Sequence, residues 1–339
     1  MAIVTEKDLT DLAARVLVRS GMDRGDAAGA ARILVMGDLF GLSTHGVSRL
    51  ESYAERLRAG GIKARPAIRV EHVAQAVAKV HGDNGVGPLV GVRALDAAME
   101  RARACGVGVA LARASNHFGA VGPYCYLAAQ QGFASIIGSN SSTSMVPTGG
   151  REARVGNSPV GFAVPTPGGD PIMLDMAISV VARAKIRDAL KRGEAIPSNW
   201  ATDRDGRPTS DPKAALDGFL SPIGGYKGYG LALIVDLFAG LLSDAAYLTH
   251  VTTWIDTPDK PQDLGHFFIL INTQALGSSE WLAARMKDFA AILHSTPAAD
   301  PSNPVLVPGE LEMGRFAKNR RDGVKIDDAL LAKLEALAG

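Results

Sequence analysis

The chain has 339 residues, of which 47% are hydrophobic and 21% charged, and its formal net charge is +1. This composition is that of an ordinary globular protein with room for about two domains, and it excludes a disordered or fibrous chain. Because the charge is so close to balanced, no overall field attracts nucleic acid or an anionic membrane, and small molecules are the expected partners. Cys105 and Cys125 are too few for a disulfide framework and lack the spacing of a zinc or redox motif, which favours a reducing cytoplasm.

Neither end of the chain nor its most apolar stretch predicts a membrane segment. The first residues, MAIVTEKDLTDL, contain no basic segment followed by an apolar core, so we expect no signal peptide. The stretch LALIVDLFAGLL at 231–242 is interrupted by Asp236, and it is far shorter than the about 20 residues that a span requires. It therefore predicts a buried helix in a cytoplasmic protein.

The opening segment of the chain is predicted to be helical. Thr5 followed by Asp8 resembles a capping box, and leucines and valines then recur at helical spacing. A second helix is expected over about 23–40. Ser43 is a suitable N-cap for a third helix, which would end at the glycine pair 60–61.

The periodicity changes after about residue 67 to short β-rich runs with helical stretches between them. Helices are expected at 88–104 and 123–131, and the segment 174–193 leaves a strand and enters a helix. After the proline-rich stretch 297–310 the chain returns to helices. The predicted strands are AVAKV (76–80), GVGVALA (106–112), FASIIG (133–138), VGFAV (160–164) and the late GHFFILIN (265–272). The pattern indicates a mixed α/β fold.

Three glycine-rich or polar stretches are candidates for ligand binding. GVGPLVG at 85–91 has the wrong spacing for a Rossmann fingerprint and is followed by no acidic residue for a ribose, so a plain turn is the better interpretation. GGYKGYG at 224–230 precedes the apolar helix, where glycine N–H groups and Lys227 could meet an anion, or could form a solvated loop. The polar run 139–159 is either a ligand loop at a strand end or a surface loop.

Histidines provide candidates for proton transfer but not for metal binding. None of the seven lies four residues from another, so a zinc pair on one helix is not expected. A helix that begins at Ser43 would place His45, Arg49 and Tyr53 on one face, combining an imidazole, a guanidinium suited to a carboxylate, and a phenol. Gly46 would let a ligand approach the backbone. The alternative is a solvated helix face. His117 lies in SNHFGAVG, beside an asparagine and before two glycines.

Several of these stretches together resemble the malate/L-lactate dehydrogenase family that lacks a Rossmann fold. The similarity runs along nearly the whole chain, in the same order. The matching motifs are STHGVSR (43–49), SNHFGAVG (115–122), the run SNSS…PTGG…GNSPVGFAVP (139–165), LDMAIS (174–179) with Lys185, GGYKGYGLAL (224–233) and PGE (308–310).

The resemblance implies an α/β, non-Rossmann, L-sulfolactate dehydrogenase-like fold, with a mixed-sheet cofactor domain and helical N- and C-terminal segments. Residues 1–70 with 297–339 would form the helical part, 71–120 an α/β region on the substrate side, and 121–296 the cofactor-binding domain. It also implies a homodimer whose active site lies near the subunit interface, and a small carboxylate as substrate.

By position, the resemblance implies roles for individual residues. His45 would donate the proton, with Ser43, Arg49 and Tyr53 on the substrate. Asp175 would orient and charge the His45 imidazole, and His117 is the other candidate acid/base. The implied cofactor residues are Asn140, the strand end Leu174, Asp175, Met176 and Ala177, the loop residues Tyr226, Lys227 and Gly228, and the turn Pro308, Gly309 and Glu310.

The resulting hypothesis is an NAD- or NADP-dependent oxidoreductase of small 2-hydroxy or 2-oxo carboxylic acids that needs no metal. The sequence has Gly156-Asn157-Ser158-Pro159 where the motif GTNP is expected, and Ile178 stands where threonine is expected in DMATS, which leaves the choice between NAD and NADP open. Because the same clamp and proton donor suit C=N, the alternative is an NADPH-dependent reductase of cyclic 2-imino acids. A binding protein that keeps the fold without catalysis is a third possibility.

Overall fold

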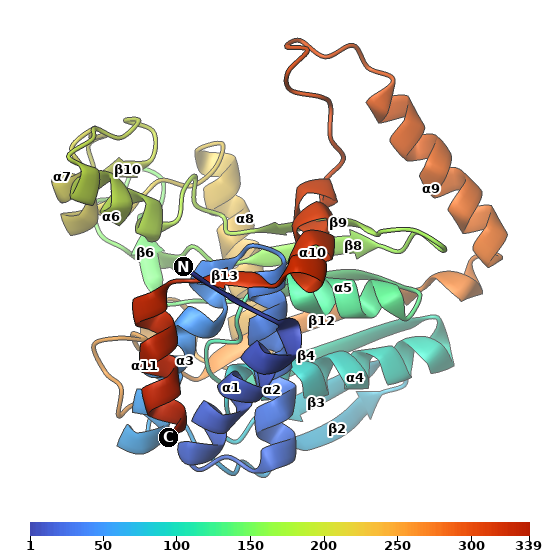
Figure 1. Ribbon diagram of the computed structural model, residues 1–339, viewed down its shortest axis with the longest axis horizontal. Helices are drawn as coiled ribbons and strands as arrows, with labels where there is room; N and C mark the ends of the chain where they lie inside the picture. Colours follow the sequence, from blue (N-terminus) through green and yellow to red (C-terminus); the bar gives the residue numbers. More distant parts are fainter.

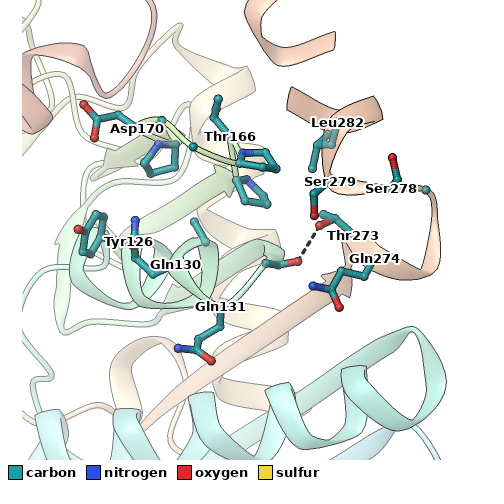
Figure 2. Close-up of a pocket in the computed structure, with 18 residues that line it drawn as sticks. Tyr126, Gln130, Gln131, Thr166, Asp170, Thr273, Gln274, Ser278, Ser279 and Leu282 are labelled. Atoms are coloured by element: carbon teal, nitrogen blue, oxygen red, sulfur yellow. Dashed lines mark hydrogen bonds between the residues drawn. The ribbon is translucent and has the colours of Figure 1, made fainter. Parts of the chain in front are cut away.

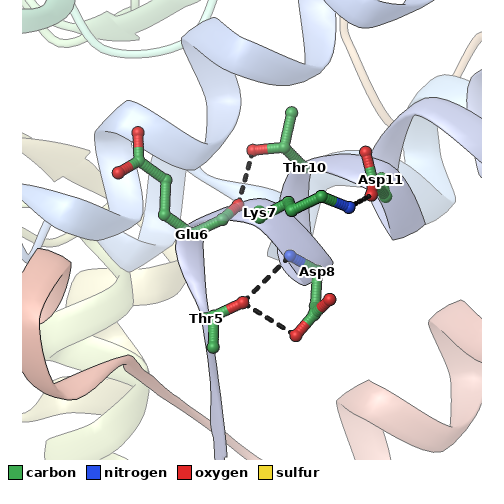
Figure 3. A network of polar contacts seen from close by, with 6 residues as sticks. All are labelled: Thr5, Glu6, Lys7, Asp8, Thr10 and Asp11. Carbon is green, nitrogen blue, oxygen red and sulfur yellow. Dashed lines mark hydrogen bonds and ion pairs between the residues drawn. The ribbon is translucent and has the colours of Figure 1, made fainter.

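The first helix begins where the sequence predicts a capping box. In the computed structural model, which describes all 339 residues, the Thr5 Oγ1 accepts the N–H of Asp8 at 3.1 Å and donates to its carboxylate at 2.7 Å (Figure 3). The hydroxyl satisfies one of the N–H groups that a helix start leaves unpaired. Helix α1 (Glu6–Arg19) then buries Leu9 and Val16 as the periodicity predicts.

Eleven α-helices are distributed along the chain (Figure 1). Those after α1 are α2 (Arg24–Leu39), α3 (Leu50–Ala59), α4 (Gly87–Cys105), α5 (Gly122–Gln130), α6 (Arg183–Arg192), α7 (Pro212–Asp217), α8 (Tyr226–Asp236), α9 (Ser279–His294), α10 (Glu310–Asp322) and α11 (Asp328–Ala338). Short 3₁₀ turns occupy Ser43–His45, Val47–Arg49, Leu248–His250 and Thr273–Ala275, and a π-turn covers Leu237–Leu241.

A seven-stranded sheet forms the centre of the molecule, in the order β2-β3-β4-β12-β5-β8-β9. All neighbours are antiparallel except β3 and β4. The strands are β2 (Arg69–Ala74), β3 (Val77–His81), β4 (Val107–Ser115), β5 (Phe133–Ser139), β8 (Val160–Val164), β9 (Ile172–Met176) and β12 (Leu264–Asn272). The late strand β12 lies between β4 and β5, so it touches the loops that follow both of them.

Two smaller sheets complete the fold. β1 (Ala2–Val4) pairs with β13 (Val324–Ile326), which ties the two ends of the chain together. The other has the order β10-β11-β6-β7, with strands at Ala201–Thr202, Phe219–Leu220, Thr143–Met145 and Val155–Gly156. The division into a helical part at 1–70 with 297–339 and two further regions stays a prediction.

The sheet separates two hydrophobic cores. The larger one joins α1, α2, α4 and α5 with one face of the sheet, and it includes Ile137, Ala163 and Met173. The smaller one lies on the other face, where residues of α6 and α8 pack with Val160 and Phe267. Figure 1 shows α4 and α5 lying along the sheet, with α8 behind it.

The predicted helix from Ser43 to residue 60 is wrong in its first two turns. Residues 43–49 form two 3₁₀ turns, and the α-helix begins only at Leu50. Gly46 separates the turns with an extended ψ of −143°, which ends one hydrogen-bonded ladder before the next begins. His45, Arg49 and Tyr53 therefore do not share one continuous helix face. The predicted end is confirmed, since Gly60 adopts the left-handed conformation with φ +87°.

The apolar stretch at 231–242 is helical but not fully buried, which corrects the prediction. Ile234, Leu237 and Leu241 are 50%, 43% and 51% exposed. No helix in the structure is both long enough and apolar enough to cross a membrane.

Candidate active site

The turn that carries His45 is built over a buried carboxylate. Asp38, on α2, is 3% exposed, and its Oδ2 accepts the N–H of Val47 at 2.7 Å. A Cβ on Gly46 would lie only 2.2 Å from the same oxygen. Gly46 is therefore needed for Asp38 to fit, and the approach of a ligand to its backbone stays a prediction. Burial raises the pKa of Asp38 to about 7.

His45 lies at the edge of this turn and faces His117. The two rings are 5.7 Å apart between centroids and inclined by 22°. The Nδ1 of His45 is 2.9 Å from the hydroxyl of the neighbouring Thr44. Burial, and then the charge of Arg49, lower the pKa of His45 to about 4, so the imidazole is neutral at pH 7.

His117 is the more firmly held of the two imidazoles. The hydroxyl of the fully buried Tyr53 lies 2.8 Å from its Nδ1 and 2.6 Å from its carbonyl oxygen. The backbone N–H of His117 donates to Gln262 Oε1 at 3.0 Å. Burial, reinforced by His45 and Arg49, holds the pKa of His117 well below its usual value. A ring fixed through one nitrogen leaves the other for proton transfer.

The guanidinium of Arg49 lies near the two imidazoles and has no acidic side chain as a partner. Its Nε donates to the carbonyl of Thr44 at 2.7 Å, and none of the ion pairs in the structure includes it. Burial, and the nearby charge of Arg187, lower the pKa of Arg49 from its usual value. A partly desolvated guanidinium favours an anion as its partner. Ser43 lies exposed at the start of the same turn.

Asp175 is hydrogen-bonded to the start of α5 and makes no hydrogen bond with His45, so the orienting role implied by position stays a prediction. Its Oδ2 accepts the N–H of Gly122 at 2.7 Å, at the start of α5. The backbone of Val121 supplies a second bond that holds down the pKa of Asp175, although burial prevails and raises it to about 6. The carboxylate therefore accepts N–H groups at the start of α5, which no helical carbonyl pairs and where the helix dipole is positive.

Asn140 is occupied within the fold, so its side chain is not free to hold a cofactor as predicted. It is 1% exposed. Its Nδ2 donates to the carbonyl of Ala246 at 2.6 Å, and its Oδ1 accepts the N–H of Gly265 at 3.0 Å. Both halves of the amide are thereby satisfied, and the residue fixes the loop after β5 to the start of β12.

Two of the predicted cofactor segments lie side by side. The carbonyl of Pro308 accepts the N–H of Met173, next to the strand end Leu174, Asp175, Met176 and Ala177, at 3.0 Å. Gly309 has φ +98°, which brings its backbone within reach of Met173. Glu310 is bound within its own region, since Oε2 accepts the N–H of Val307 and Oε1 pairs with His294, both at 2.8 Å. This part of the prediction remains a hypothesis about the cofactor.

The loop before α8 has the properties of a phosphate site. Gly224 and Gly225 have φ values of +57° and +64°, and no side chain caps the helix that starts at Tyr226. Lys227 is exposed and takes part in no ion pair. Unpaired N–H groups at a helix start, with a lysine beside them, fit the pyrophosphate of a dinucleotide.

The same loop adjoins the end of β9. Ile223 donates its N–H to the carbonyl of Ile178 at 2.9 Å. A Cβ on Gly228 would lie 2.0 Å from the carbonyl oxygen of Ile223, which explains a glycine inside the first turn of α8. The predicted residues 174–177 and 226–228 thus belong to neighbouring segments.

Sequence reasoning missed His266, whose side chain links the end of β4 to the end of β5. It is fully buried on β12, with Nδ1 2.9 Å from Ser139 Oγ and Nε2 2.7 Å from Ser115 Oγ. Its ring stacks on Phe118 at 4.2 Å. The signal was a single histidine inside the apolar run GHFFILIN, because a buried polar group in a strand needs partners.

The large polar cleft shown in Figure 2 lies elsewhere. It has a volume of about 710 Å³ and is bounded by the end of α5, the turn between β8 and β9, and the start of α9. Asp170 is its one charged lining residue, beside amides such as Gln130 and Gln274. None of the predicted site residues lines it.

Comparisons with known proteins agree along the whole chain. Residues 4–335 match the family model described as Malate/L-lactate dehydrogenase. The Ureidoglycolate dehydrogenase (NAD(+)) of Escherichia coli is 33% identical, over 96% of this chain and 93% of that protein. The sulfolactate dehydrogenase structure from Methanocaldococcus jannaschii superposes with a TM-score of 0.92 at 34% identity, covering 99% of this chain and 96% of that one.

A delta1-piperideine-2-carboxylate reductase from Pseudomonas syringae is also similar, with a TM-score of 0.89, 29% identity, and coverage of 99% of this chain and 100% of that one. The similarity to the sulfolactate dehydrogenase confirms the fold that the resemblance implied.

Proposed function

This chain belongs to the malate/L-lactate dehydrogenase family, and from that premise we propose that it transfers hydride between NAD(P) and a small 2-hydroxy or 2-oxo carboxylic acid. Its relatives are dehydrogenases that act on CH–OH groups, and the chain is an oxidoreductase of this kind.

The observation that carries the proposal is Arg49 without a counterion beside two neutral imidazoles. A substrate carboxylate would pair with this guanidinium in the bidentate geometry that arginine favours. The carbon next to the carboxylate would then lie beside His45 and His117. Positioning of this kind accounts for much of the rate enhancement in hydride transfer.

His117 is the better candidate for the proton because Tyr53 fixes its ring, whereas Asp175 gives His45 no support. In the oxidative direction the neutral imidazole accepts the hydroxyl proton of the substrate. The bound nicotinamide supplies the chemistry of hydride acceptance or donation. His45 stays the alternative, with its ring on the other side of the same space.

In the reductive direction the imidazole has to carry a proton, which the charge of Arg49 opposes in the free protein. A carboxylate bound to Arg49 would cancel that charge. The pKa of both histidines would then rise, because an opposing positive charge has been neutralised. Substrate binding would therefore make protonation of the imidazole easier, although burial, the largest cause of the lowered pKa, would still oppose it.

The cofactor would be held by the loop 224–228 and by the adjoining segments 174–177 and 308–310. The support is the uncapped start of α8, the free Lys227, and the hydrogen bond between Met173 and Pro308. In this arrangement the pyrophosphate meets the helix start and no metal is required.

A homodimer is the proposed assembly, and two unpaired apolar surfaces support it. Ile136, Phe162 and Leu174 are cross-strand neighbours on β5, β8 and β9, and each is 36–39% exposed. Helix α9 buries none of its residues, and Figure 1 shows it standing away from the rest of the molecule. Phe289 and Ile292 on this helix are 54% and 61% exposed. Exposed apolar side chains that lie together in this way are typical of an interface.

A substrate panel tests the function. Purified protein with NADH or NADPH is assayed against pyruvate, oxaloacetate, 2-oxoglutarate, longer 2-oxo acids and cyclic 2-imino acids, by loss of reduced-nicotinamide absorbance. Turnover of a 2-oxo acid is the expected result. Turnover of imines alone with NADPH would instead establish the second candidate, which the similarity to the piperideine-carboxylate reductase supports. Cofactor binding without any turnover would favour a binding protein.

A further inference from the structure

A strap of irregular chain, residues 251–262, lies against the candidate site, and hydrogen bonds join its two ends to each other. Gln262 Nε2 donates to the carbonyl of Thr252 at 3.4 Å, and the Thr252 hydroxyl donates to the carbonyl of Pro261 at 2.6 Å. The same Gln262 accepts the backbone N–H of His117 at 3.0 Å. The strap is therefore fixed to the loop that carries the proposed proton acceptor.

Arg56 holds the middle of the strap. This arginine is 1% exposed, and its guanidinium donates to the carbonyl oxygens of Trp254 and Thr257, each at 2.9 Å, and to that of Lys260. Gly61 lets the strap pass, because a Cβ there would lie 2.0 Å from the carbonyl oxygen of Pro258. A guanidinium is suited to this task, since its planar donors reach several acceptors at once.

The strap presents one large side chain to the site, that of Trp254. Its ring lies 5.2 Å from the His117 ring and 5.0 Å from the Tyr53 ring, between centroids. The Arg56 guanidinium lies against it at 4.8 Å. Its indole N–H is buried and has no acceptor in the protein. An unpaired buried donor beside a functional histidine is a reason to expect a role in ligand binding.

We propose that Trp254 is a specificity-determining residue, whose indole forms the wall against which the side chain of the hydroxy acid lies, with Arg56 as the positioning residue that holds this wall in place. The inference rests on the proposed function and names what limits its substrate class. With the carboxylate on Arg49 and the reacting carbon at His117, the substituent extends toward the ring that contacts His117. The wall restricts the site to hydroxy acids with short side chains.

The proposed role of Trp254 can be tested without turnover by calorimetry. The binding of pyruvate and of 4-methyl-2-oxopentanoate is measured with the protein saturated with oxidised nucleotide. The kcat/KM of both compounds is measured alongside. In Trp254→Ala the preference for the longer acid over pyruvate is expected to rise about 10- to 100-fold, the range that a few methylenes in an apolar pocket provide. Trp254→Phe should keep a preference near that of the unaltered protein. Arg56→Lys, which cannot reach three carbonyls, should shift the preference in the same direction as the alanine variant, but less.

Ile255→Ala is the matched control, because Ile255 is the next residue of the strap and its side chain is 64% exposed. Its preference should not change. An unaltered preference in Trp254→Ala, or an equal loss for both acids, would overturn the wall while leaving the proposed function standing. If the unaltered protein binds neither acid but turns over another 2-oxo acid of the panel, the proposed role of Trp254 fails alone; if it also turns over no compound of the panel, the proposed function fails as well. Should the alanine variant not fold, Trp254→Leu provides the same test.

Discussion

The site around His117 and the region around α9 differ in whether their side chains find partners within the same chain. Tyr53 is fully buried and Asp38 is 3% exposed, each with a hydrogen-bond partner in the same chain. On α9, in contrast, Phe289 and Ile292 are 54% and 61% exposed and nothing packs over them. The residues of the proposed chemistry thus find their partners within one chain, whereas the apolar side chains of α9 find none, and the proposed homodimer would cover them.

The largest effect is expected from His117→Asn. Loss of the acid/base group should lower kcat by about 100- to 10,000-fold while cofactor binding is retained, because proton transfer contributes about that much to catalysis. Steady-state kinetics and a fluorescence titration with NADH provide the two readouts. His45→Asn is the matched comparison. If His45→Asn were the more damaging change, the proton-transfer role would belong to His45.

Arg49→Lys should raise KM by about 10- to 100-fold with a smaller change in kcat, because an ammonium cannot replace bidentate carboxylate binding. Arg49→Gln should in addition raise the pKa of both histidines, since the guanidinium charge lowers them in the unaltered protein. The acid limb of the kcat/KM profile for oxidation would then move to higher pH. A pH profile that does not move would show that the charge of Arg49 does not influence the pKa of the proton-transfer group.

A charge on α9 should break the proposed dimer without harming the fold. The double change Phe289→Asp with Ile292→Asp is expected to weaken self-association by at least about 10-fold, since each charge would have to be desolvated at the interface. Light scattering over a range of concentrations measures it. Val70→Asp is the control, because Val70 is also exposed, at 42%, but lies on β2 at the other edge of the sheet. A concentration-independent monomer for the unaltered protein would contradict the proposal.

Of these substitutions, Asp38→Asn should have the smallest effect on activity. Its effect on the free energy of unfolding should depend on pH. The folded pKa of Asp38 is raised to about 7 from a usual value of 3.8, so between these values the folded state binds the extra proton. The free energy of unfolding should therefore fall as pH rises from 4 to 7, by up to about 4 kcal/mol from this group. The asparagine variant should lose that part of the dependence. Urea unfolding of both proteins at pH 5 and pH 8 measures this. If the free energy of unfolding changes equally with pH in the two proteins, the effect of Asp38 is excluded.

Much of the fold could be predicted from the sequence because local patterns decide it. The capping box at Thr5, the strand GHFFILIN and the glycine end at residue 60 are each specified by neighbouring residues. The position of β12 between β4 and β5 could not be read in this way, since strand order depends on contacts between distant segments.

The candidate site was predicted in composition but not in arrangement. The motifs identified His45, Arg49, Tyr53 and His117, and the structure brings them together. The expected helix face was wrong, because it was inferred from separation along the chain, and the predicted pairing of His45 with Asp175 has no hydrogen bond to support it. Nothing in the spacing indicated that Tyr53 would bond His117, which lies 64 residues away.

The sequence by itself determined the family, the reactive residue types and most of the local structure, since motifs and periodicity are local properties of the chain. Only the tertiary structure decided which partner each polar group has. Asp38 lies under Gly46, Asn140 bonds Ala246 and Gly265, and Arg56 holds the strap. The physical reason is that a buried polar group must find its hydrogen-bond partner wherever the folded chain places one, and that placement is not encoded in spacing.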